Sequence, residues 1–317
     1  MTGCHGLLLL TMTAVLTGTP VLAADEPAAL NIDRLFESPD LSGPQPRGLK
    51  ISPDSSRVTF LRGKEDDRLQ MDLWEYHLGE GKIRLLVDST DLVAGPENLS
   101  EEEQARRERL RIVDQRGIVS YQFSPDGGSL LFPLNGDLYL YTLASGEVRQ
   151  LTATDSGEID PKFSPEGSYV SFVRDQNLFV IDLATGKERA LTEDGGGLIK
   201  NGLAEFIAQE EMRRYTGYWW SPDESTIAFM QVDESPVKIV QRFEVYAEDF
   251  KVYDQRYPEA GTPNVNVRLG VVGLEDASVR WLDTGDDPDV YLPRVGWFPD
   301  SRQLAVQRQS RDQQTLD

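Results

Sequence analysis

The chain has 317 residues, of which 39% are hydrophobic and 27% charged, and it carries 27 glycines, 18 prolines and a formal net charge of −21. This balance is typical of a soluble globular protein with many turns. The large surplus of negative charge argues against nucleic acid and anionic membrane surfaces as partners, and it favours cationic ligands.

The first segment of the chain differs from the rest. Residues 7–24 carry no charge and end in small residues, with Val21 and Ala23 at the −3 and −1 positions of a signal-peptidase site. The apolar run is shorter than a comfortable membrane span. We therefore predict a secretion signal over residues 1–23, with a retained anchor as the alternative, and a periplasmic or secreted mature protein.

Removal of this signal would change the chemistry of the chain. Cys4, the only cysteine, and His5 both lie within it, so the mature chain would have no thiol and a single histidine, His77. An exported protein with a large core and no disulfide suits a bacterial periplasm or exterior.

A 40-residue repeat organises the middle of the chain. The segment YQFSPDGGSLLFPLNGDLYLYTLASGEVRQLT ends at Thr152, and PKFSPEGSYVSFVRDQNLFVIDLATGKERALT ends at Thr192. Their aromatic residues, prolines, glycines and final Leu-Thr pairs match at intervals of 40 positions. The Ser-Pro-Asp/Glu turn also occurs at residues 51–55 and 220–224 and, with Phe in place of Ser, at 297–301, so five copies are visible.

Each copy divides into short strands joined by tight turns. Strands are expected at 129–134 and 137–143, because Asn135-Gly136 between them is a strong signal for a two-residue hairpin. The Ser-Pro-Asp-Gly segment and Ser145-Gly146 supply two more turns. Four strands in ~40 residues predict an all-β protein, a β-propeller of four-stranded blades.

Two insertions interrupt this repeat. Pro53 and Pro125 are 72 positions apart, and Pro165 and Pro222 are 57 apart. Extra segments of roughly 30 and 17 residues therefore break a period near 40. Insertions in repeat folds gather at one rim, which is often the binding rim. Both insertions contain predicted short helices, and we expect function there.

The first insertion contains the helical segment SEEEQARRERLR. Ser100 and Glu103 form a capping box, and the acidic residues that follow Ser100 suit the positive end of a helix. Glu102 with Arg106 and Glu103 with Arg107 have the i,i+4 spacing of ion pairs. Taken alone, these residues describe a solvated helix that pairs with itself.

The second insertion contains AEFIAQEEMRRYTGYWW, in which Glu210 and Glu211 are adjacent. Arg214 stands at i,i+4 and i,i+3 from them, so a short surface helix accounts for both. Alternatively, Phe206 and Ile207 press the two carboxylates towards protein, where their repulsion would require a cation such as a protonated amine. The chemistry of the residues leaves both interpretations open.

The remaining motifs carry little chemistry. Trp219 and Trp220 precede a blade turn and are expected to pack between blades. The aspartates of residues 283–290 lack the pattern of a calcium loop and indicate a solvated turn. His77 is expected on a strand or hairpin. We expect no metal and no cofactor.

The segment GLAEFIAQEEMRRYTGYWWSPDESTIAFMQVDESPV resembles the double-glutamate segment of the dipeptidyl peptidase IV group of the prolyl oligopeptidase superfamily, especially its bacterial members. The stretch SEEEQARRERLR, followed by GIVSYQFSPDG, resembles the arginine-bearing segment of the same group. The likeness covers nearly all of the mature chain. It implies an eight-bladed propeller, with about five blades in this chain, that caps an α/β-hydrolase domain in a serine exopeptidase, with a homodimer as the full-length protein.

The resemblance also implies roles for particular residues. Glu210 and Glu211 would bind the free α-amine of a peptide substrate, so that a dipeptide ending in Pro or Ala is released. An arginine of the first insertion, either Arg107 or Arg111, would hold a carbonyl of the substrate.

The chain departs from the family in its catalytic residues. It contains no Gly-x-Ser-x-Gly segment, and His77 is the only histidine after the predicted signal. A Ser-His-Asp triad needs an exposed nucleophile and a base. We therefore expect residues 24–317 to be the N-terminal propeller of such an enzyme, incomplete at its C-terminus and inactive alone. The alternative is a periplasmic propeller that binds protein or peptide without catalysis.

Overall fold

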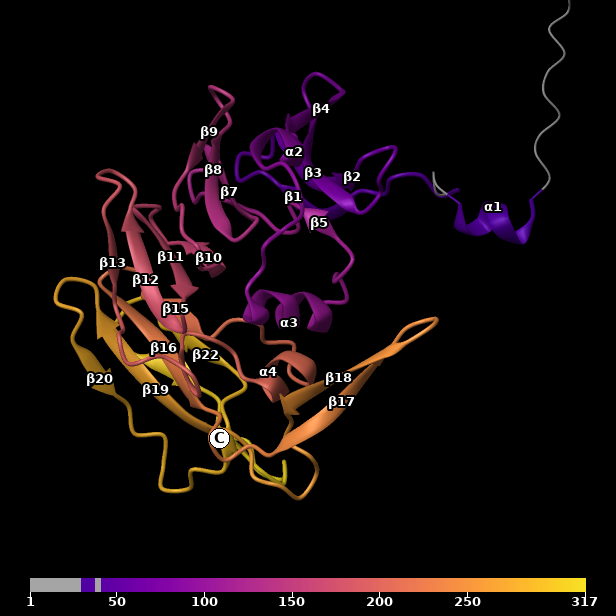
Figure 1. Ribbon diagram of the computed structural model, residues 1–317. Helices are drawn as coiled ribbons and strands as arrows, with labels where there is room; N and C mark the ends of the chain where they lie inside the picture. Colours follow the sequence, from indigo (N-terminus) through magenta and orange to yellow (C-terminus); the bar gives the residue numbers. More distant parts are fainter. Residues whose placement is uncertain (1–29, 38–40) are drawn as a thin grey trace, which may run out of the picture.

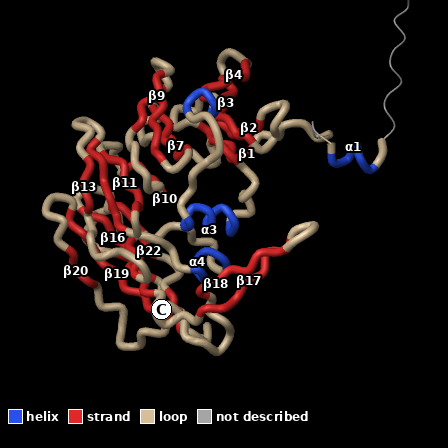
Figure 2. Tube along the Cα trace, viewed as in Figure 1, coloured by secondary structure: helices blue, strands red, loops and turns tan. Residues whose placement is uncertain are grey.

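The computed structural model of the protein describes residues 30–37 and 41–317, so the predicted signal over residues 1–23 lies outside the described residues. Antiparallel sheets follow one another around an arc in chain order, with few helices between them (Figures 1 and 2). The fold is therefore all-β and propeller-like, as the repeat predicts.

Four of the sheets have the size of complete blades. The first contains β1 (Arg47–Ile51), β2 (Arg57–Gly63), β3 (Gln70–His77) and β4 (Lys82–Val87), with β5 (Arg116–Gly117) parallel to β3. The second contains β6 (Gln122–Phe123), β7 (Ser129–Leu134), β8 (Asp137–Thr142) and β9 (Glu147–Gln150). The third contains β10 (Ile159–Phe163), β11 (Tyr169–Arg174), β12 (Asn177–Asp182) and β13 (Glu188–Ala190). The fourth contains β14 (Ile199–Asn201), β15 (Tyr218–Trp220), β16 (Thr226–Asp233), β19 (Asn266–Gly273) and β20 (Val279–Trp281).

The fifth copy of the repeat is smaller. Its turn joins β22 (Val295–Trp297) to β23 (Leu304–Val306), and β21 (Val290–Tyr291) pairs with β24 (Gln309–Ser310) beside it. The helices are α1 (Ile32–Phe36), α2 (Ser89–Leu92), α3 (Glu101–Arg109) and α4 (Phe206–Glu210). None of the helices in the described ranges has the length and apolar character needed to cross a membrane.

The hairpin predicted at Asn135-Gly136 is confirmed. These two residues have φ values of 53° and 92°, and they connect β7 to β8 in the register that the sequence suggests. The second strand ends at Thr142, one residue earlier than predicted. His77 ends β3, which confirms its predicted place on a strand.

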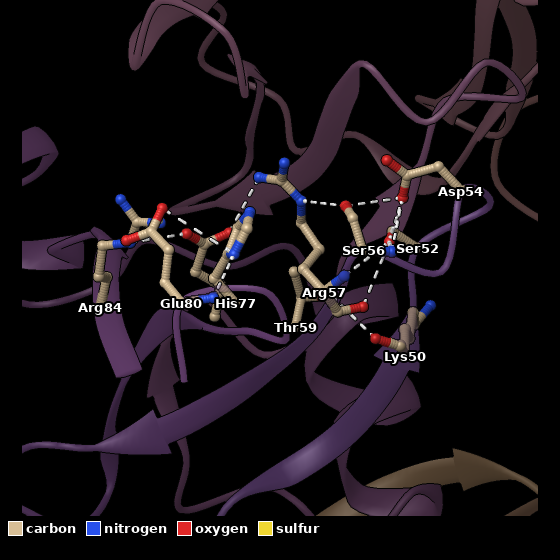
Figure 3. A network of polar contacts seen from close by, with 10 residues as sticks. Lys50, Ser52, Asp54, Ser56, Arg57, Thr59, His77, Glu80 and Arg84 are labelled. Atoms are coloured by element: carbon tan, nitrogen blue, oxygen red, sulfur yellow. Dashed lines mark hydrogen bonds and ion pairs between the residues drawn. The ribbon is translucent and has the colours of Figure 1, made fainter. Parts of the chain in front are cut away.

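The Ser-Pro-Asp turn is held by one hydroxyl and one carboxylate, as Figure 3 shows for the first blade. The Ser52 hydroxyl donates to Asp54 at 2.6 Å and accepts from the backbone N–H of Arg57 at 3.1 Å. Hydrogen bonds from Ser52 and Ser56 lower the pKa of Asp54 to about 2. The residue after the acidic position has a positive φ in all five copies: Ser55 57°, Gly127 74°, Gly167 83°, Glu224 58° and Ser301 59°.

These turns also make contacts from blade to blade. A Cβ on Gly127 would lie 3.0 Å from the Cδ of Pro53, and a Cβ on Gly167 would lie 3.3 Å from the Cδ of Pro125. In the fourth and fifth copies, which lack this glycine, side chains make the connection. The Glu224 carboxylate accepts from the backbone N–H of Glu166 at 2.7 Å, and the Ser301 hydroxyl accepts from that of Asp223 at 3.0 Å.

Replacement of Gly127 by alanine is expected to lower the free energy of unfolding by about 2–4 kcal/mol, because a left-handed conformation and a contact with Pro53 are both unfavourable for Cβ. Gly186 is the matched control, since its φ is 71° and nothing lies within 4 Å of its Cβ position. Gly186→Ala should cost only about 1–2 kcal/mol. Urea denaturation measures both, and equal losses would contradict the proposed packing on Pro53.

A second set of contacts links the inner strands of neighbouring blades. Each contact is a side-chain donor, two residues before the turn serine, that reaches a backbone carbonyl of the next blade: Lys50 to Tyr121 at 2.6 Å, Gln122 to Pro161 at 2.6 Å and Lys162 to Tyr218 at 2.8 Å. The residue at this position in the fourth blade is Trp219, and here its own carbonyl accepts from the indole of Trp297 at 2.9 Å. These contacts repeat with the blades and form an inter-blade ladder.

Apolar side chains fill the space between successive blades. Trp220 packs with Val173 and Leu178 of the third sheet, and its ring stacks on Tyr169. Trp219 packs against a cluster that joins Met230 of the fourth sheet to Val295 of the fifth copy. Both tryptophans therefore pack between blades, as predicted.

The two helical insertions are confirmed, and the structure reveals a third insertion. The hairpin of β17 (Ile239–Val245) and β18 (Phe250–Arg256) is inserted between β16 and β19 and projects from the sheets (Figure 1). Arg242 of this hairpin pairs with Glu108 of α3. The sequence carried one sign of this insertion, the 77 positions between Pro222 and Pro299.

Candidate functional site

The two helical insertions meet in the structure. Helices α3 and α4 lie side by side next to the arc of sheets (Figures 1 and 2). The guanidinium of Arg109, at the end of α3, donates to the side-chain oxygen of Gln209 at 3.2 Å. Its Nε lies 3.9 Å from Glu210 Oε1. Residues that are about a hundred positions apart in the chain therefore form one site.

Helix α4 is short, and its caps fix where the glutamates lie. The Glu205 carboxylate accepts from the backbone N–H of Ala208 at 2.9 Å and so caps the N-terminus. Glu211 is the C-cap residue, and its backbone N–H donates to the carbonyl of Ile207 at 2.9 Å. Glu210 is thus the last residue of the helix and Glu211 the first beyond it.

This geometry corrects the ion pairs predicted for Arg214. Because the helix ends at Glu210, Arg214 does not stand one turn further along the same face. Instead its side chain is only 5% exposed, its Nη2 lies 3.7 Å from Glu205 Oε1, and its Nη1 donates to the carbonyl of Thr216 at 2.8 Å. The prediction of a short surface helix in which Arg214 pairs with Glu210 and Glu211 is therefore wrong.

The pair of Glu205 and Arg214 lies in the interior beneath the site. Burial raises the pKa of Glu205 and lowers the pKa of Arg214, because each charge has left water. Within the part of the chain that the structure describes, Glu205 Oε2 and Arg214 Nη2 have no hydrogen-bond partner. Each of these charges therefore depends on the other for its compensation.

Glu210 and Glu211 have different surroundings. The Glu210 side chain is 26% exposed and lies 3.9 Å from Arg109 and 4.0 Å from Arg111, so the first insertion offsets part of its charge. Glu211 is exposed, and its carboxylate has no ion pair among residues 30–37 and 41–317. The Phe206 ring faces the guanidinium of Arg109, with 5.0 Å between its centroid and the Cζ.

The two arginines predicted from the resemblance occupy different places. Arg107 is 5% exposed, and its guanidinium donates to Glu97 at 2.7 Å, to Glu103 at 3.0 Å and to the carbonyl of Gln115 at 3.0 Å. Its contacts are those of a residue that holds the first insertion together, and the predicted Glu103 pair is among them. Arg111 is 78% exposed and has a φ of 59°, and it is the predicted arginine that lies beside Glu210.

The other predicted pair of this helix differs from the structure. Glu102 accepts from the side-chain amide of Gln176 at 3.1 Å, whereas Arg106 pairs with Glu103 at 3.4 Å. Sequence reasoning also missed Arg109, because helical spacing alone does not say which arginine faces the second insertion.

A cavity of about 300 Å³ opens between the two insertions and the fourth sheet. Charges of both signs line it together with two aromatic rings; among the lining residues are Glu102, Arg106, Arg109, Glu205, Phe206 and Tyr215. In the described residues no three His, Cys, Asp or Glu side chains are grouped to hold a metal ion. The aspartates of the segment 283–290 instead form local turns, with Asp283 accepting from the N–H of Gly285 at 2.9 Å.

Four-stranded blades around an arc, with two helical insertions that meet beside adjacent glutamates, define a propeller-like domain whose candidate site lies at its insertions. Residues 124–317, well over half of the chain, match the family described as the Dipeptidyl peptidase IV (DPP IV) N-terminal region, and the chain belongs to this family.

Individual relatives agree with this membership. Human dipeptidyl peptidase 8 is 31% identical over 123 residues, which are 32% of this chain and 14% of that protein. Mouse inactive dipeptidyl peptidase 10 is 32% identical over 113 residues, 33% of this chain and 14% of that protein. A probable dipeptidyl-aminopeptidase B of Pyrenophora tritici-repentis is 29% identical over 229 residues, 66% of this chain and 21% of that protein. The chain thus matches about a fifth or less of the length of these relatives.

Solved structures support the fold. The dipeptidyl peptidase 4 of Porphyromonas gingivalis superposes with a TM-score of 0.64 and 25% identity, over 85% of this chain and 37% of that chain. A putative dipeptidyl aminopeptidase IV from Bacteroides ovatus superposes with a TM-score of 0.53 and 22% identity, over 84% of this chain and 34% of that chain.

Proposed function

We propose that this chain is the substrate-selecting propeller of a secreted serine dipeptidyl peptidase, in which Glu210 and Glu211 bind the free α-amine of a peptide. The observation that carries the proposal is the end of α4, where Glu210 lies beside the arginines of the other insertion and the next residue, Glu211, is exposed. Glu211 has no internal cation in the described ranges, so it is available to a ligand.

The proposed chemistry follows from these groups. An α-ammonium has three N–H donors, and two carboxylates accept them in short charge-assisted hydrogen bonds. When the α-amine nitrogen of a peptide is anchored, each peptide bond lies at a fixed distance from the amine site. Cleavage at the second of these bonds would release a dipeptide. Arg111 is exposed and lies 4.0 Å from Glu210, which supports a role for its guanidinium as the donor to a substrate carbonyl.

The rest of the activity would require groups beyond this site. We propose that an α/β-hydrolase domain of the full-length protein supplies the nucleophile and the base, that the products are Xaa-Pro and Xaa-Ala dipeptides, and that the full-length protein is a periplasmic or secreted homodimer. The matches to the Porphyromonas gingivalis and human peptidases support this proposal.

A non-catalytic binding propeller is the second candidate. The mouse relative that is called inactive dipeptidyl peptidase 10 is similar in sequence to a third of this chain, so sequences of this kind also occur in a protein described as inactive. The gene sequence beyond codon 317 distinguishes the two candidates, because only the peptidase requires a nucleophile-elbow serine and a late histidine.

An Xaa-Pro peptide with a free amine is expected to bind this chain about ten to a hundred times more tightly than its N-acetylated counterpart, since the acetyl group leaves two carboxylates without their cation. Titration calorimetry of both peptides measures the ratio. Equal affinities would overturn the proposed amine site, whether or not the full-length protein is catalytic.

A further inference from the structure

One arginine spans the whole of α4. Arg109 contacts Phe206 through its guanidinium face, Gln209 through a hydrogen bond of 3.2 Å and Glu210 through a separation of 3.9 Å. These three residues are spaced i, i+3 and i+4, so they form one face of the helix. Arg109 therefore contacts the first turn and the last residue of α4 together.

Helix α4 depends on such contacts for its position. It has five residues, and a helix this short is not stable in water by itself. Two further contacts join α4 to its surroundings: Phe206 packs edge-on to Tyr257 at 5.2 Å, and Gln209 donates back to the carbonyl of Ala204 at 2.6 Å. Among these contacts, only those of Arg109 extend to the glutamate at the end.

The two arginines beside Glu210 differ in their freedom to move. The Arg109 side chain is 18% exposed and Arg111 is 78% exposed. Burial lowers the pKa of Arg109, while the carboxylates of Glu210, Glu108, Glu234 and Glu205 oppose this change. A stacked and largely buried guanidinium is held in one orientation, whereas an exposed arginine side chain is free to change its conformation when a ligand binds.

We infer that Arg109 is a positioning residue, which fixes the direction of the Glu210 carboxylate from behind the proposed amine site and leaves Arg111 to contact the substrate. This inference rests on the proposed function of Glu210. It predicts that Arg109 controls how well the site distinguishes a free amine from a blocked one, although Arg109 itself does not touch the substrate.

The planar shape of arginine is central to this role. Lysine at position 109 would keep the charge, but its single ammonium group cannot stack on Phe206 and donate to Gln209 as the guanidinium does. Arg109→Lys is therefore expected to restore only part of what Arg109→Ala removes.

The test compares the affinities for free and N-acetylated Xaa-Pro peptides in the wild-type chain and in four variants. Arg109→Ala should weaken binding of the free peptide about tenfold and leave the acetylated peptide unchanged, with Arg109→Lys between it and the wild type. Glu210→Gln should also lower the ratio of the affinity for the free peptide to the affinity for the acetylated peptide. Arg149→Ala is the control, because Arg149 is exposed in β9 and the variant removes an equal charge.

The outcomes separate this inference from the proposed function. A wild-type ratio in Arg109→Ala together with a lowered ratio in Glu210→Gln would overturn only the role of Arg109. An equal loss of affinity for both peptides would also overturn it, because a general structural defect does not distinguish the amine. An unchanged ratio in Glu210→Gln would reject the amine site itself. If Arg109→Ala does not fold, as judged by thermal melting, Arg109→Gln takes its place with the same expected ratio.

Discussion

Replacement of Glu210 and Glu211 together by glutamine is expected to weaken the binding of a free-amine Xaa-Pro peptide about a hundredfold, while the affinity for the N-acetylated peptide stays the same. Glutamine keeps the size of each side chain, but it brings an amide N–H₂ group where the ammonium needs acceptors. The double variant should therefore lose the distinction between the two peptides. Titration calorimetry with both peptides measures this loss.

A matched double variant controls for the acidity of the whole chain. With a net charge of −21, the protein attracts any cation from a distance, and the loss of two charges anywhere weakens this attraction slightly. Glu147→Gln with Glu275→Gln removes the same charge from two exposed positions outside the site. At physiological salt this control should differ from the wild type by less than about twofold, because such distant charges are screened. A control that loses as much affinity as the site variant would attribute the effect to overall charge.

Replacement of Arg214 by methionine is expected to lower the free energy of unfolding by about 3–5 kcal/mol at neutral pH, because it leaves the buried Glu205 carboxylate without its partner. Both side chains are 5% exposed, so water cannot take over this role. Glu205 also caps α4, and its loss of compensation would therefore disturb the position of the two glutamates. Urea denaturation of the wild type and the variant measures the difference.

The same variant should show a distinctive pH dependence. Burial raises the pKa of Glu205 above its ordinary value, and loss of the Arg214 charge raises it further. A carboxyl with a raised pKa in the folded state is favourable there while it is protonated, and this contribution disappears as the pH rises through the folded pKa. The stability difference between wild type and variant should thus be small below about pH 4 and largest at neutral pH.

A neutral replacement of both partners provides the control for this prediction. Glu205→Gln combined with Arg214→Met removes the buried charge along with its partner, and replacement of both partners is generally far less costly than removal of one. The double variant should recover most of the lost stability at neutral pH. If the loss of stability in Arg214→Met stays constant with pH, the lost packing of Arg214 causes the destabilisation, and the charge of Glu205 does not.

The blades and turns could be predicted because short segments determine them. Asn135-Gly136 requires two positive φ values, and the Ser-Pro-Asp turn satisfies its own backbone groups within five residues. Even Glu224 and Ser301, which lack the conformational freedom of glycine, adopt the turn with φ near 58°. The projecting hairpin was missed because its alternating strands look like those of a blade, and only the length of the interval distinguishes them.

The site was predictable only in part, because its geometry depends on the tertiary contacts of two separate insertions. The adjacent glutamates were found from the sequence, but their pairing with Arg214 required a helix longer than the one that forms. The arginines of α3 illustrate a second limit. Positions 107 and 109 lie on nearly opposite sides of a helix, and the sequence does not show which side faces the blades. The structure turns Arg107 to the interior and Arg109 to α4.

The inter-blade ladder has a direction, and this direction bears on how the chain folds during synthesis. Lys50, Gln122 and Lys162 each reach forward to a carbonyl that is made later than the donor. At about 5–20 residues per second, Tyr121 leaves the ribosome several seconds after Lys50. Until then the ammonium of Lys50 is bound by water, and its blade lacks this contact. Each blade is therefore completed by its successor, so the propeller matures one blade behind the growing end of the chain.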